Sequence, residues 1–365
     1  MNGVFVYMKG VILVGGLGTR LRPLTYTHPK PLIPFANKPI IKHQIEALAR
    51  AGVTEVILAV GHMQENIREL LYGYDKELGI EISYSYESVP MGTAGPLSLL
   101  RDRLQTEEGP FFVLNSDIIC TFPFEEMLGH HTLHGGDGTI LVTKVNEPSK
   151  YGVIVTDRNS QIMKFIEKPK EFVGDRINAG VYLFSKEILK YIEERPMSIE
   201  KDVLPRMITQ KVVKAFDLKG FWMDIGQPKD YVTGNILYHE NNKECIMIDK
   251  TAKISATAVI GKNTTIGPNV EIEDGVEIEN SIVFDGACIQ KNSLIVNSII
   301  GWGACVGRWS RIEDYSVLGA NVTVQEGIYI TGGLIHPNTL VSIHVLLQQT
   351  PVLPEINTNK ESPAI

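Results

Sequence analysis

Apolar side chains recur at every sixth residue in the last third of the chain. The first set consists of Ile254, Ile260, Ile266, Ile272, Ile278 and Phe284. A second residue, mostly apolar or small, follows each of them after four positions, at Ala258, Thr264, Val270, Val276, Ile282 and Cys288. A period of six is typical of hexapeptide turns and predicts a left-handed parallel β-helix. An ordinary β-sandwich is the alternative, but it would not keep a period of six.

The period changes frame once along this region. The second set, offset by four residues from the first, consists of Leu294, Ile300, Val306, Ile312, Leu318, Val324 and Ile330. The offset predicts one irregular turn or a short insertion near Asp285–Leu294. With about 18 residues to a coil, residues 254–330 correspond to roughly four coils.

Residues 9–240 show a different pattern, in which short apolar runs alternate with amphipathic segments. The apolar runs predict strands at Val11–Val14, Glu55–Val60, Phe111–Leu114, Thr139–Val145 and Val181–Phe184. The amphipathic segments predict helices at Pro39–Arg50, Gln64–Leu71, Ala94–Arg103 and Pro228–Glu240. Strands that alternate with helices favour an α/β fold with a Rossmann-like, mostly parallel sheet. Ligands of such sheets usually bind beyond the carboxyl ends of the strands.

The two patterns predict two domains and a tail. The α/β domain takes residues 1–240, a linker 241–250, the β-helix domain 251–348 and a polar tail 349–365. A chain of 365 residues is longer than one core usually organises, which agrees with two domains.

Composition argues against several classes of protein. The net charge is −7, whereas a dedicated nucleic-acid binder usually carries a basic excess. No apolar run approaches the ~20 residues of a membrane span. Lys9 and Gly10 interrupt any signal peptide, and Met8 is an alternative start, so we expect a cytoplasmic protein. The four cysteines form no CxxC motif, which argues against a zinc site or a disulfide framework.

A glycine-rich loop follows the first predicted strand. Its sequence is Gly15-Gly16-Leu17-Gly18-Thr19-Arg20. Glycines let the backbone approach a phosphate closely, and Arg20 adds a charge that can bind phosphate through two hydrogen bonds. The loop is not the dinucleotide motif GxGxxG, because Leu21 takes the last glycine position, and the Walker A candidate at Gly261-Lys262 lacks its first glycine. A tight strand–helix turn is the structural alternative.

Charged residues further along the chain predict the rest of a phosphate site. Lys30, in Pro29-Lys30-Pro31-Leu32, is a second cation. Asp117 follows the apolar run Phe111–Leu114, and Asp224 lies within the apolar run Phe221–Ile225. Two such carboxylates suit Mg²⁺, which proteins hold with one or two carboxylates plus substrate phosphates. Asp117, taken alone, would also suit a cap or a turn, whereas a carboxylate buried in an apolar run, as expected for Asp224, needs a partner.

Polar residues beside two later strands predict a sugar subsite. Glu167 and Asn178 can hydrogen-bond to sugar hydroxyls, and Lys168 can contact the phosphate of the sugar. Each of them, taken alone, would also suit the protein surface.

These motifs, in this order, resemble the nucleotidyltransferase family that makes nucleoside-diphosphate sugars. The matching runs are GGLGTRLRPLT, PKPL, MGTAGPL, NSD, EKP, NAG and FWMDIGQPKDY. The β-helix belongs to the same resemblance, which covers nearly the whole chain. Three further runs, Phe111–Asp117, Leu141–Val153 and Ser198–Lys201, are similar to the branch of the family that uses GTP and mannose 1-phosphate. The uninterrupted glycine loop favours its catalytic type over its regulatory type.

The resemblance implies the reaction and its components. An oxygen of mannose 1-phosphate would attack the α-phosphorus of GTP in line, and GDP-mannose and pyrophosphate would leave, with Mg²⁺ as cofactor. It also implies a homo-oligomer, or a hetero-oligomer with a related regulatory subunit. The β-helix of the family usually closes with Pro-x-Ile-Ile-Met, whereas here Pro354-Glu355-Ile356 is followed by Asn357. Subunit contacts through that end are therefore not implied.

The resemblance also assigns roles to residues. The nucleotide would be bound by Leu13, Gly15, Gly16, Gly18, Thr19, Arg20, Lys30, Gly92, Thr93, Ala94 and Asp117. The sugar phosphate would be bound by Gly152, Glu167, Lys168, Asn178 and Asp224. Asp117 and Asp224 would hold Mg²⁺, and the catalytic residues would be Arg20, Lys30 and Lys168.

Three alternatives stay open at this point. The same fold would serve glucose 1-phosphate with UTP, dTTP or ATP. Acyl transfer on the β-helix would need a general base, typically His, but residues 254–330 contain none, and His336 and His344 lie beyond them. The third alternative is a regulatory chain that binds the nucleotide sugar without turnover.

Overall fold

The computed structural model describes residues 7–16, 18–61, 64–106 and 109–346. Leu17 of the glycine loop, the tail 349–365 and its run at Pro354 lie outside the described residues. The chain forms two compact units. One consists of Met1–Leu17 and Ile40–Trp222, and the other of Gly18–Pro39 and Met223–Ile365. The glycine loop is therefore divided between the two units.

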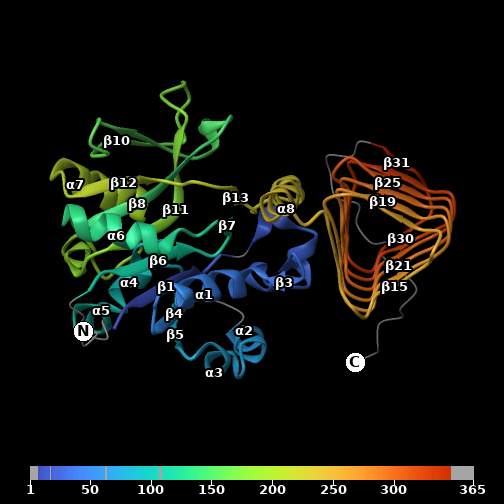
Figure 1. The fold of residues 1–365 in the computed structure, drawn as a ribbon, viewed down its shortest axis with the longest axis horizontal. Helices are drawn as coiled ribbons and strands as arrows, with labels where there is room; N and C mark the ends of the chain where they lie inside the picture. The colour runs from blue at the N-terminus through green and yellow to red at the C-terminus, as the bar shows by residue number, and fades with distance from the viewer. Residues whose placement is uncertain (1–6, 17, 62–63, 107–108, 347–365) are drawn as a thin grey trace, which may run out of the picture. The chain divides into compact units, whose positions relative to one another are not determined.

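A mixed sheet of nine strands forms the centre of the first unit (Figure 1). Its parallel part has the order β6 (Phe111–Asn115), β1 (Lys9–Val14), β4 (Glu55–Val60) and β5 (Glu81–Tyr86). Side chains of β4 are buried on both faces, as expected for a parallel strand inside an α/β fold. The α/β fold with its mostly parallel sheet is confirmed.

The other strands extend this sheet beyond β6. The antiparallel partner of β6 is β11 (Arg176–Phe184), which is followed by β9 (Gly152–Thr156) and β10 (Ile162–Glu167). β11 also pairs antiparallel with β8 (Gly138–Lys144), and β8 pairs in parallel with β12 (Val213–Asp217). Two short strands, β7 (Ile118–Cys120) and β13 (Trp222–Asp224), lie outside the nine.

Seven α-helices belong to the described part of the first unit. They are α1 (Ile40–Arg50), α2 (Gln64–Leu70), α3 (Tyr74–Leu78), α4 (Gly95–Ser98), α5 (Arg101–Gln105), α6 (Phe124–His134) and α7 (Leu204–Thr209). The single helix expected at Ala94–Arg103 is wrong, because a turn at Leu99 and Leu100 separates α4 from α5. The turn exposes Leu99 and leaves Leu100 buried, so core packing overrides the helical period. No helix in the described ranges is both long and apolar enough to cross a membrane.

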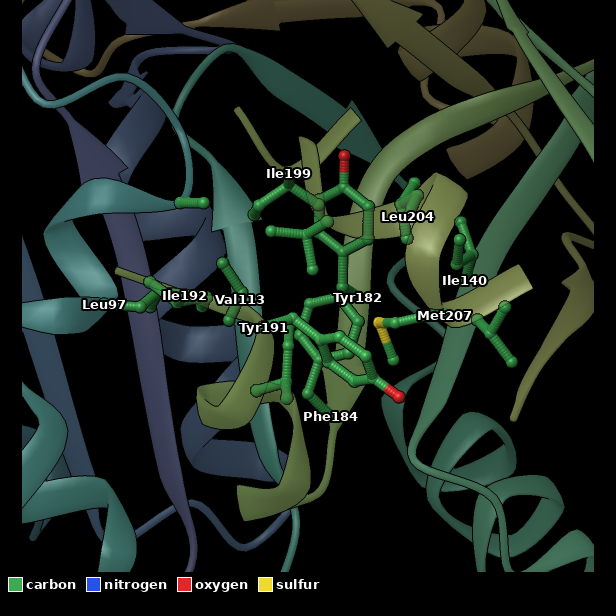
Figure 2. Packing of buried hydrophobic residues seen from close by; sticks show 14 of the residues in the cluster. Leu97, Val113, Ile140, Tyr182, Phe184, Tyr191, Ile192, Ile199, Leu204 and Met207 are labelled. Carbon is green, nitrogen blue, oxygen red and sulfur yellow. The ribbon is translucent and has the colours of Figure 1, made fainter. Parts of the chain in front are cut away.

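The core of this unit gathers large side chains from the sheet and from the segments that cover it. Figure 2 shows Tyr182 and Phe184 of β11 packed with Tyr191 and Met207. The rings of Tyr182 and Phe184 are two residues apart and stack with centroids 5.4 Å apart. A fully buried side chain of this size contributes about 1.5–3 kcal/mol to stability. The core thus fixes β11, which also carries the predicted site residue Asn178.

The second unit begins with the loop segment Gly18–Pro39. It contains three short 3₁₀ turns, at Thr19–Leu21, Leu24–Tyr26 and Lys30–Leu32, and a small hairpin of β2 (Pro34–Phe35) and β3 (Lys38–Pro39). The long helix α8 (Pro228–Asn242) confirms the helix predicted at Pro228–Glu240.

A β-helix of three parallel, six-stranded sheets completes this unit (Figure 1). The first sheet consists of β14 (Ile246–Ile248), β17 (Thr264–Ile266), β20 (Ile282–Val283), β23 (Ile299–Ile300), β26 (Val317–Leu318) and β29 (Leu334–Ile335). The second consists of β15 (Lys253–Ile254), β18 (Glu271–Ile272), β21 (Cys288–Ile289), β24 (Cys305–Val306), β27 (Thr323–Val324) and β30 (Leu340–Val341). The third consists of β16 (Val259–Ile260), β19 (Glu277–Glu279), β22 (Leu294–Val296), β25 (Arg311–Glu313), β28 (Tyr329–Thr331) and β31 (Val345–Leu346). The β-helix is confirmed, and its strands extend beyond residues 254–330 at both ends.

The change of frame has a different cause from the one expected. The inner residues follow the order Ile278, Val283, Ile289, Ile295, Ile300, so a step of five replaces a step of six twice. The irregular turn predicted at Asp285–Leu294 is therefore wrong. The shortened corners contain Asn280 and Asn297, both in the left-handed conformation with φ of 48°. Asparagine tolerates this conformation, which also occurs at Asn269 and Asn292 in corners that keep the step of six.

Candidate functional site

Three charged side chains of the second unit converge on Gly226, two residues after β13. A Cβ built on Gly226 would lie 2.8 Å from Asp224 Oδ1, 3.2 Å from Arg20 Nη2 and 3.4 Å from Lys30 Nζ. Glycine at this position therefore leaves room for two cations and one carboxylate in a small space. The cluster carries one positive charge more than negative, which suits a phosphate group. The structure thus brings together Arg20, Lys30 and Asp224.

The loop closes on itself around Gly18, which has a left-handed φ of 63°. A Cβ on Gly18 would lie 3.0 Å from Thr25 Cγ2 and 3.1 Å from Lys30 Cβ. The Thr25 hydroxyl donates a hydrogen bond of 2.8 Å to the Gly18 carbonyl. Lys30 is 9% exposed, whereas Arg20 and Thr19 are exposed. The guanidinium of Arg20 makes no hydrogen bond or ion pair with another described residue, so it is available to a ligand.

The first half of the glycine loop lies at the carboxyl ends of three parallel strands. Gly15 follows β1, Gly61 follows β4 and Glu87 follows β5. A Cβ on Gly61 would lie 3.6 Å from Gly15 Cα, and a Cβ on Gly15 would lie 3.2 Å from Glu87 Oε1. Nothing lies within 4 Å of a Cβ built on Gly16. This is the edge of the sheet where ligands are expected, and Leu13, near the end of β1, pairs there with Asn115.

Glu87 is a site residue that sequence reasoning missed. The Met91 N–H donates a hydrogen bond of 2.9 Å to Glu87 Oε2. Burial raises the pKa of Glu87, and this hydrogen bond opposes the shift. A half-buried carboxyl group beside the glycine loop can recognise a donor group of a nucleotide. A single acidic residue after a strand gives no motif from which it could be found.

The run Met91–Ala94 is fastened to a second segment of the first unit. The Ala94 N–H donates to the Met197 carbonyl at 2.9 Å, and the Met197 N–H donates to the Met91 carbonyl at 3.0 Å. Gly92 has a φ of 73°, and a Cβ on it would lie 2.4 Å from the Met197 carbonyl oxygen. Only glycine allows the two segments to come this close. The close approach therefore requires glycine at position 92, in addition to any role in binding the nucleotide.

The side chain of Thr93 is engaged in the same link. Its hydroxyl donates to Glu200 Oε2 at 2.7 Å and accepts from the Ile199 N–H at 2.8 Å. Contacts from Gly92, Thr93 and Ala94 to a nucleotide would therefore come from their backbone. Glu200 also accepts a hydrogen bond of 2.7 Å from Ser198.

Gly152, Glu167 and Lys168 lie together in the first unit. Gly152 of β9 pairs with Glu167 of β10, and a Cβ on Gly152 would lie 2.3 Å from Phe165 Cζ and 3.0 Å from Glu167 Oε2. Lys168 has a left-handed φ of 45°, and its N–H donates to the Tyr151 carbonyl at 3.0 Å. A strained backbone at a residue other than glycine is frequent at functional sites. The exposed Lys168 side chain is thus held at a fixed turn.

Asn178 joins this group through a network of hydrogen bonds. The register of β11 shifts between Asn178 and Tyr182. Asn178 donates to the Tyr182 hydroxyl at 2.8 Å, and this hydroxyl donates to Glu200 Oε1 at 2.9 Å. Burial raises the pKa of Glu167, and the negative charge of Glu200 raises it further. Glu200 therefore connects the predicted nucleotide run to the predicted sugar residues. It lies in the matching run Ser198–Lys201, but the sequence assigned it no role.

Asp117 lies in a turn that a buried glutamine holds. Gln44, fully buried on α1, donates from Nε2 to the carbonyls of Asn115 at 2.9 Å and Ile118 at 3.0 Å. A Cβ on Gly180 would lie 2.8 Å from Asn115 Nδ2. The turn carrying Asp117 therefore packs against the irregular part of β11 that carries Asn178. Gln44 is a second positioning residue that the sequence did not reveal.

The donor chemistry of Asp117 and Asp224 fits Mg²⁺. Both offer carboxylate oxygens, which Mg²⁺ prefers, and phosphates and water complete its shell in such sites. Zinc sites need three or four His, Cys, Asp or Glu ligands, and no group of three occurs among the residues described. Asp117 belongs to the first unit and Asp224 to the second. A shared ion therefore remains a prediction.

Comparisons with known proteins agree with these features. Residues 9–241 match the family model described as "Nucleotidyl transferase", and residues 242–351 match the "GMPPB C-terminal domain". The chain is 53% identical over 354 residues to the mannose-1-phosphate guanyltransferase of Kluyveromyces lactis, covering 93% of this chain and 98% of that protein. It is 49% identical over 363 residues to the enzyme of the same name from Schizosaccharomyces pombe, covering 95% and 100%.

Two further comparisons cover the subunit type and the fold. The chain is 50% identical over 351 residues to the mannose-1-phosphate guanylyltransferase catalytic subunit beta of Drosophila melanogaster, covering 92% of this chain and 95% of that protein. A solved structure of a putative glucose-1-phosphate thymidylyltransferase from Bacillus anthracis is similar with a TM-score of 0.57. Its sequence identity is 24%, over 65% of this chain and 95% of that one, so this likeness shows the fold alone.

Proposed function

Because the chain belongs to the nucleotidyl transferase family, with a C-terminal domain of the GMPPB type, we propose that it is a mannose-1-phosphate guanylyltransferase. It transfers GMP from GTP to mannose 1-phosphate and releases GDP-mannose and pyrophosphate. The relatives that carry this name match over nearly their whole length. The structural observation that carries the proposal is the convergence of Arg20, Lys30 and Asp224 on Gly226.

The main obstacle to the reaction is repulsion between two polyanions. A phosphate oxygen of the sugar forms a new bond to the α-phosphorus of GTP, and the bond from this phosphorus to the bridging oxygen of pyrophosphate breaks. The nucleophile is already an anion, so no proton has to be removed and no covalent enzyme intermediate is needed. Holding the two reactants in line and neutralising their charge supplies most of the catalysis.

The cations of the chain have separate tasks in this proposal. Arg20 and Lys30 bind the triphosphate and stabilise the charge that develops on the leaving pyrophosphate. Lys168 binds the phosphate of mannose 1-phosphate and orients the attacking oxygen. Mg²⁺, held by Asp117 and Asp224, would neutralise phosphate charge further.

Specificity for the sugar rests on acceptor and donor groups of the first unit. Glu167 and Asn178 hydrogen-bond to hydroxyls of the sugar, and the backbone of Gly152 lies beside Glu167, where the lack of a side chain makes room for the Phe165 ring. Glu200 keeps Asn178 in place through the Tyr182 hydroxyl, 2.9 Å away. On the nucleotide side, Glu87 accepts from donor groups of guanine.

A panel of substrates tests the proposal. Purified protein with Mg²⁺ is assayed for pyrophosphate release with GTP, ATP, UTP or dTTP, each with mannose 1-phosphate or glucose 1-phosphate. We expect the highest kcat/KM for GTP with mannose 1-phosphate, and GDP-mannose as the product by mass spectrometry. A higher kcat/KM for another pair would identify a different enzyme of the family. Binding of GDP-mannose without any turnover would instead support the regulatory alternative.

Radiolabelled pyrophosphate tests the direct mechanism. It should exchange into GTP only when GDP-mannose is present. Exchange with enzyme and GTP alone would require a covalent guanylyl-enzyme, which the proposal excludes.

We propose that the β-helix mediates self-association or pairing with a related subunit, because sheet edges of this kind can be extended by strands of another chain. The four cysteines are free, which agrees with the cytoplasmic location expected above.

A further inference from the structure

Three aromatic rings project from one corner of the β-helix. Phe284 follows β20, Trp302 follows β23 and His336 follows β29, and these strands belong to the same sheet. We call these three residues the corner column. None of them is among the residues that fill the interior of the coils. Their partners lie instead on the loop segment Gly18–Pro39 and on α8.

The loop segment contacts the corner column at the residues before Lys30. The ring of His28 stacks on Trp302 with centroids 3.8 Å apart and planes at 20°. Trp302 stacks in turn on Phe284, with centroids 4.4 Å apart and planes at 17°. Two residues before His28, the ring of Tyr26 contacts the ring of His336, with centroids 4.7 Å apart.

The residues after Lys30 are anchored to the same place through α8. Phe35 meets Tyr231 edge to face at 5.6 Å, and Tyr231 meets Phe284 edge to face at 6.4 Å. The Tyr231 hydroxyl donates a hydrogen bond to the Pro34 carbonyl. Phe35 and Tyr231 are fully buried. Asn37 adds a hydrogen bond of 2.8 Å to the carbonyl of Ile266, in β17 of the same sheet.

These contacts form a circuit with Lys30 inside it. One arm runs from His28 through Trp302 to Phe284, and the other runs from Phe35 through Tyr231 to the same Phe284. The six residues between His28 and Phe35 include the 3₁₀ turn Lys30–Leu32. The position of this turn, and of the Lys30 ammonium beside Gly226, is therefore determined by rings of the β-helix and α8.

We propose that Trp302 is a positioning residue for the phosphate-binding cations, and that the β-helix thereby tunes the handling of GTP. This inference rests on the proposed function only for the identity of the nucleotide. The β-helix then does more than assemble subunits, because its corner column holds the loop that carries Arg20 and Lys30. Loss of the Trp302 ring removes one anchor and lets the Lys30 turn move relative to Asp224. A misplacement of about 1 Å in such a site can cost 10²-fold in rate.

Variants of Trp302 test this role, with a second tryptophan as the control. Trp302→Ala should lower kcat/KM for GTP by about 10- to 100-fold while KM for mannose 1-phosphate changes less than about threefold. Trp302→Phe keeps a flat ring and should retain activity within about threefold of the unchanged protein. Trp309→Ala removes a 63% exposed ring from the same β-helix and should leave both constants unchanged.

A double variant separates positioning from general destabilisation. If Trp302 acts through Lys30, then Trp302→Ala should add less than about threefold to the loss caused by Lys30→Met alone. Multiplicative losses would overturn the proposal, as would a Trp302→Ala protein with unchanged kcat/KM for GTP. If Trp302→Ala shows no cooperative thermal transition, His28→Ala removes the stacked ring from the loop side and should give the same selective loss for GTP.

Binding without turnover keeps this proposal distinct from the proposed reaction. Calorimetric titration with GTP and Mg²⁺, in the absence of any sugar phosphate, should show weaker binding by the Trp302→Ala protein. Weaker GTP binding would support the positioning role even if another sugar phosphate were the acceptor. Unchanged GTP affinity in a protein that makes GDP-mannose would refute the positioning role alone.

Discussion

Replacing Gly226 with alanine should lower the activity while leaving the thermal stability nearly unchanged. The new methyl group would lie 2.8 Å from Asp224 Oδ1 and 3.2 Å from Arg20 Nη2. Ordinary contacts of a Cβ begin at 3.4 Å, so the carboxylate has to move by at least about 0.6 Å, the difference between 3.4 and 2.8 Å. Lys30 Nζ, at 3.4 Å, is just in contact and would follow its neighbours.

The expected loss of activity follows from this displacement. If about 1 Å of misplacement costs 10²-fold, then about 0.6 Å shared by a carboxylate and a cation should cost 10- to 100-fold in kcat/KM. Such a loss corresponds to about 1.4–2.7 kcal/mol of transition-state stabilisation. The loss should appear for GTP at saturating mannose 1-phosphate, because Arg20, which is displaced together with Asp224, is assigned to the triphosphate.

The thermal midpoint should respond differently. Gly226 does not have a positive φ, so alanine fits its backbone, and replacing glycine at such a position stabilises by about 0.4–1 kcal/mol through the unfolded chain. This gain opposes the local strain, so we expect a midpoint near that of the unchanged protein. Gly129→Ala is the matched control, since nothing lies within 4 Å of a Cβ at that position on α6. It should raise stability slightly and leave kcat/KM unchanged.

Steady-state pyrophosphate release and differential scanning fluorimetry measure the two quantities on the same preparations. A folded Gly226→Ala protein with kcat/KM for GTP within threefold of the unchanged enzyme would refute the reasoning. It would mean that the cluster around Gly226 does not bind the reacting phosphates.

Four more results are expected. Asp117→Asn should lower kcat by about two orders of magnitude with Mg²⁺, and unchanged turnover would exclude Asp117 as a metal ligand. Lys168→Ala should raise KM for mannose 1-phosphate far more than the calorimetric Kd for GTP, and an equal loss in both would contradict its role. Glu87→Gln should reduce the preference for GTP over ATP by about tenfold in kcat/KM, whereas an unchanged ratio would place the base elsewhere. Burial, followed by repulsion from nearby histidines, lowers the pKa of His131 and His134 to about 4. A histidine in the unfolded chain has a pKa near 6.5, so between pH 6.5 and pH 4 the unfolded chain binds more protons than the folded protein. The free energy of unfolding, measured by chemical denaturation, should therefore fall as the pH is lowered from 6.5 to 4. It should fall less in a variant with glutamine at both positions.

Patterns of burial predicted most of the fold. The strand at Glu55–Val60 was predicted to the residue, because an unbroken apolar run marks a strand covered on both faces. The antiparallel position of β11 between β6 and β9 was not predictable, because strand order depends on partners far away in the sequence. The break between α4 and α5 was missed because the leucines keep a helical spacing across it.

Motifs predicted the charged residues of the candidate site but not the residues that hold them. Arg20, Lys30 and Asp224 belong to recognisable runs, and the structure places all three around Gly226. Glu200 and Gln44 act through hydrogen bonds to other segments. Gln44 lies in no matching run, and the run Ser198–Lys201 gave Glu200 no role, so the sequence did not distinguish either from ordinary polar residues. Such residues become visible only when the partners of each polar group are known.

Two features of the second unit could not be predicted from the sequence pattern, and for one reason. Phe284 is apolar, falls on the period of six and is buried, so its pattern does not distinguish it from the residues inside the coils. The groups that bury it are Tyr231 and Trp302, outside the coil, and this contact belongs to the circuit that holds the Lys30 turn. A hydrophobic period reports that a side chain is buried but not which surface buries it. The grouping of Gly18–Pro39 with the β-helix was not predictable for the same reason, since its aromatic partners are separated from it by about 200 residues or more along the chain. Aromatic residues at the corners of a hexapeptide repeat, where small or polar residues would suffice, are therefore the signal to look for in related chains.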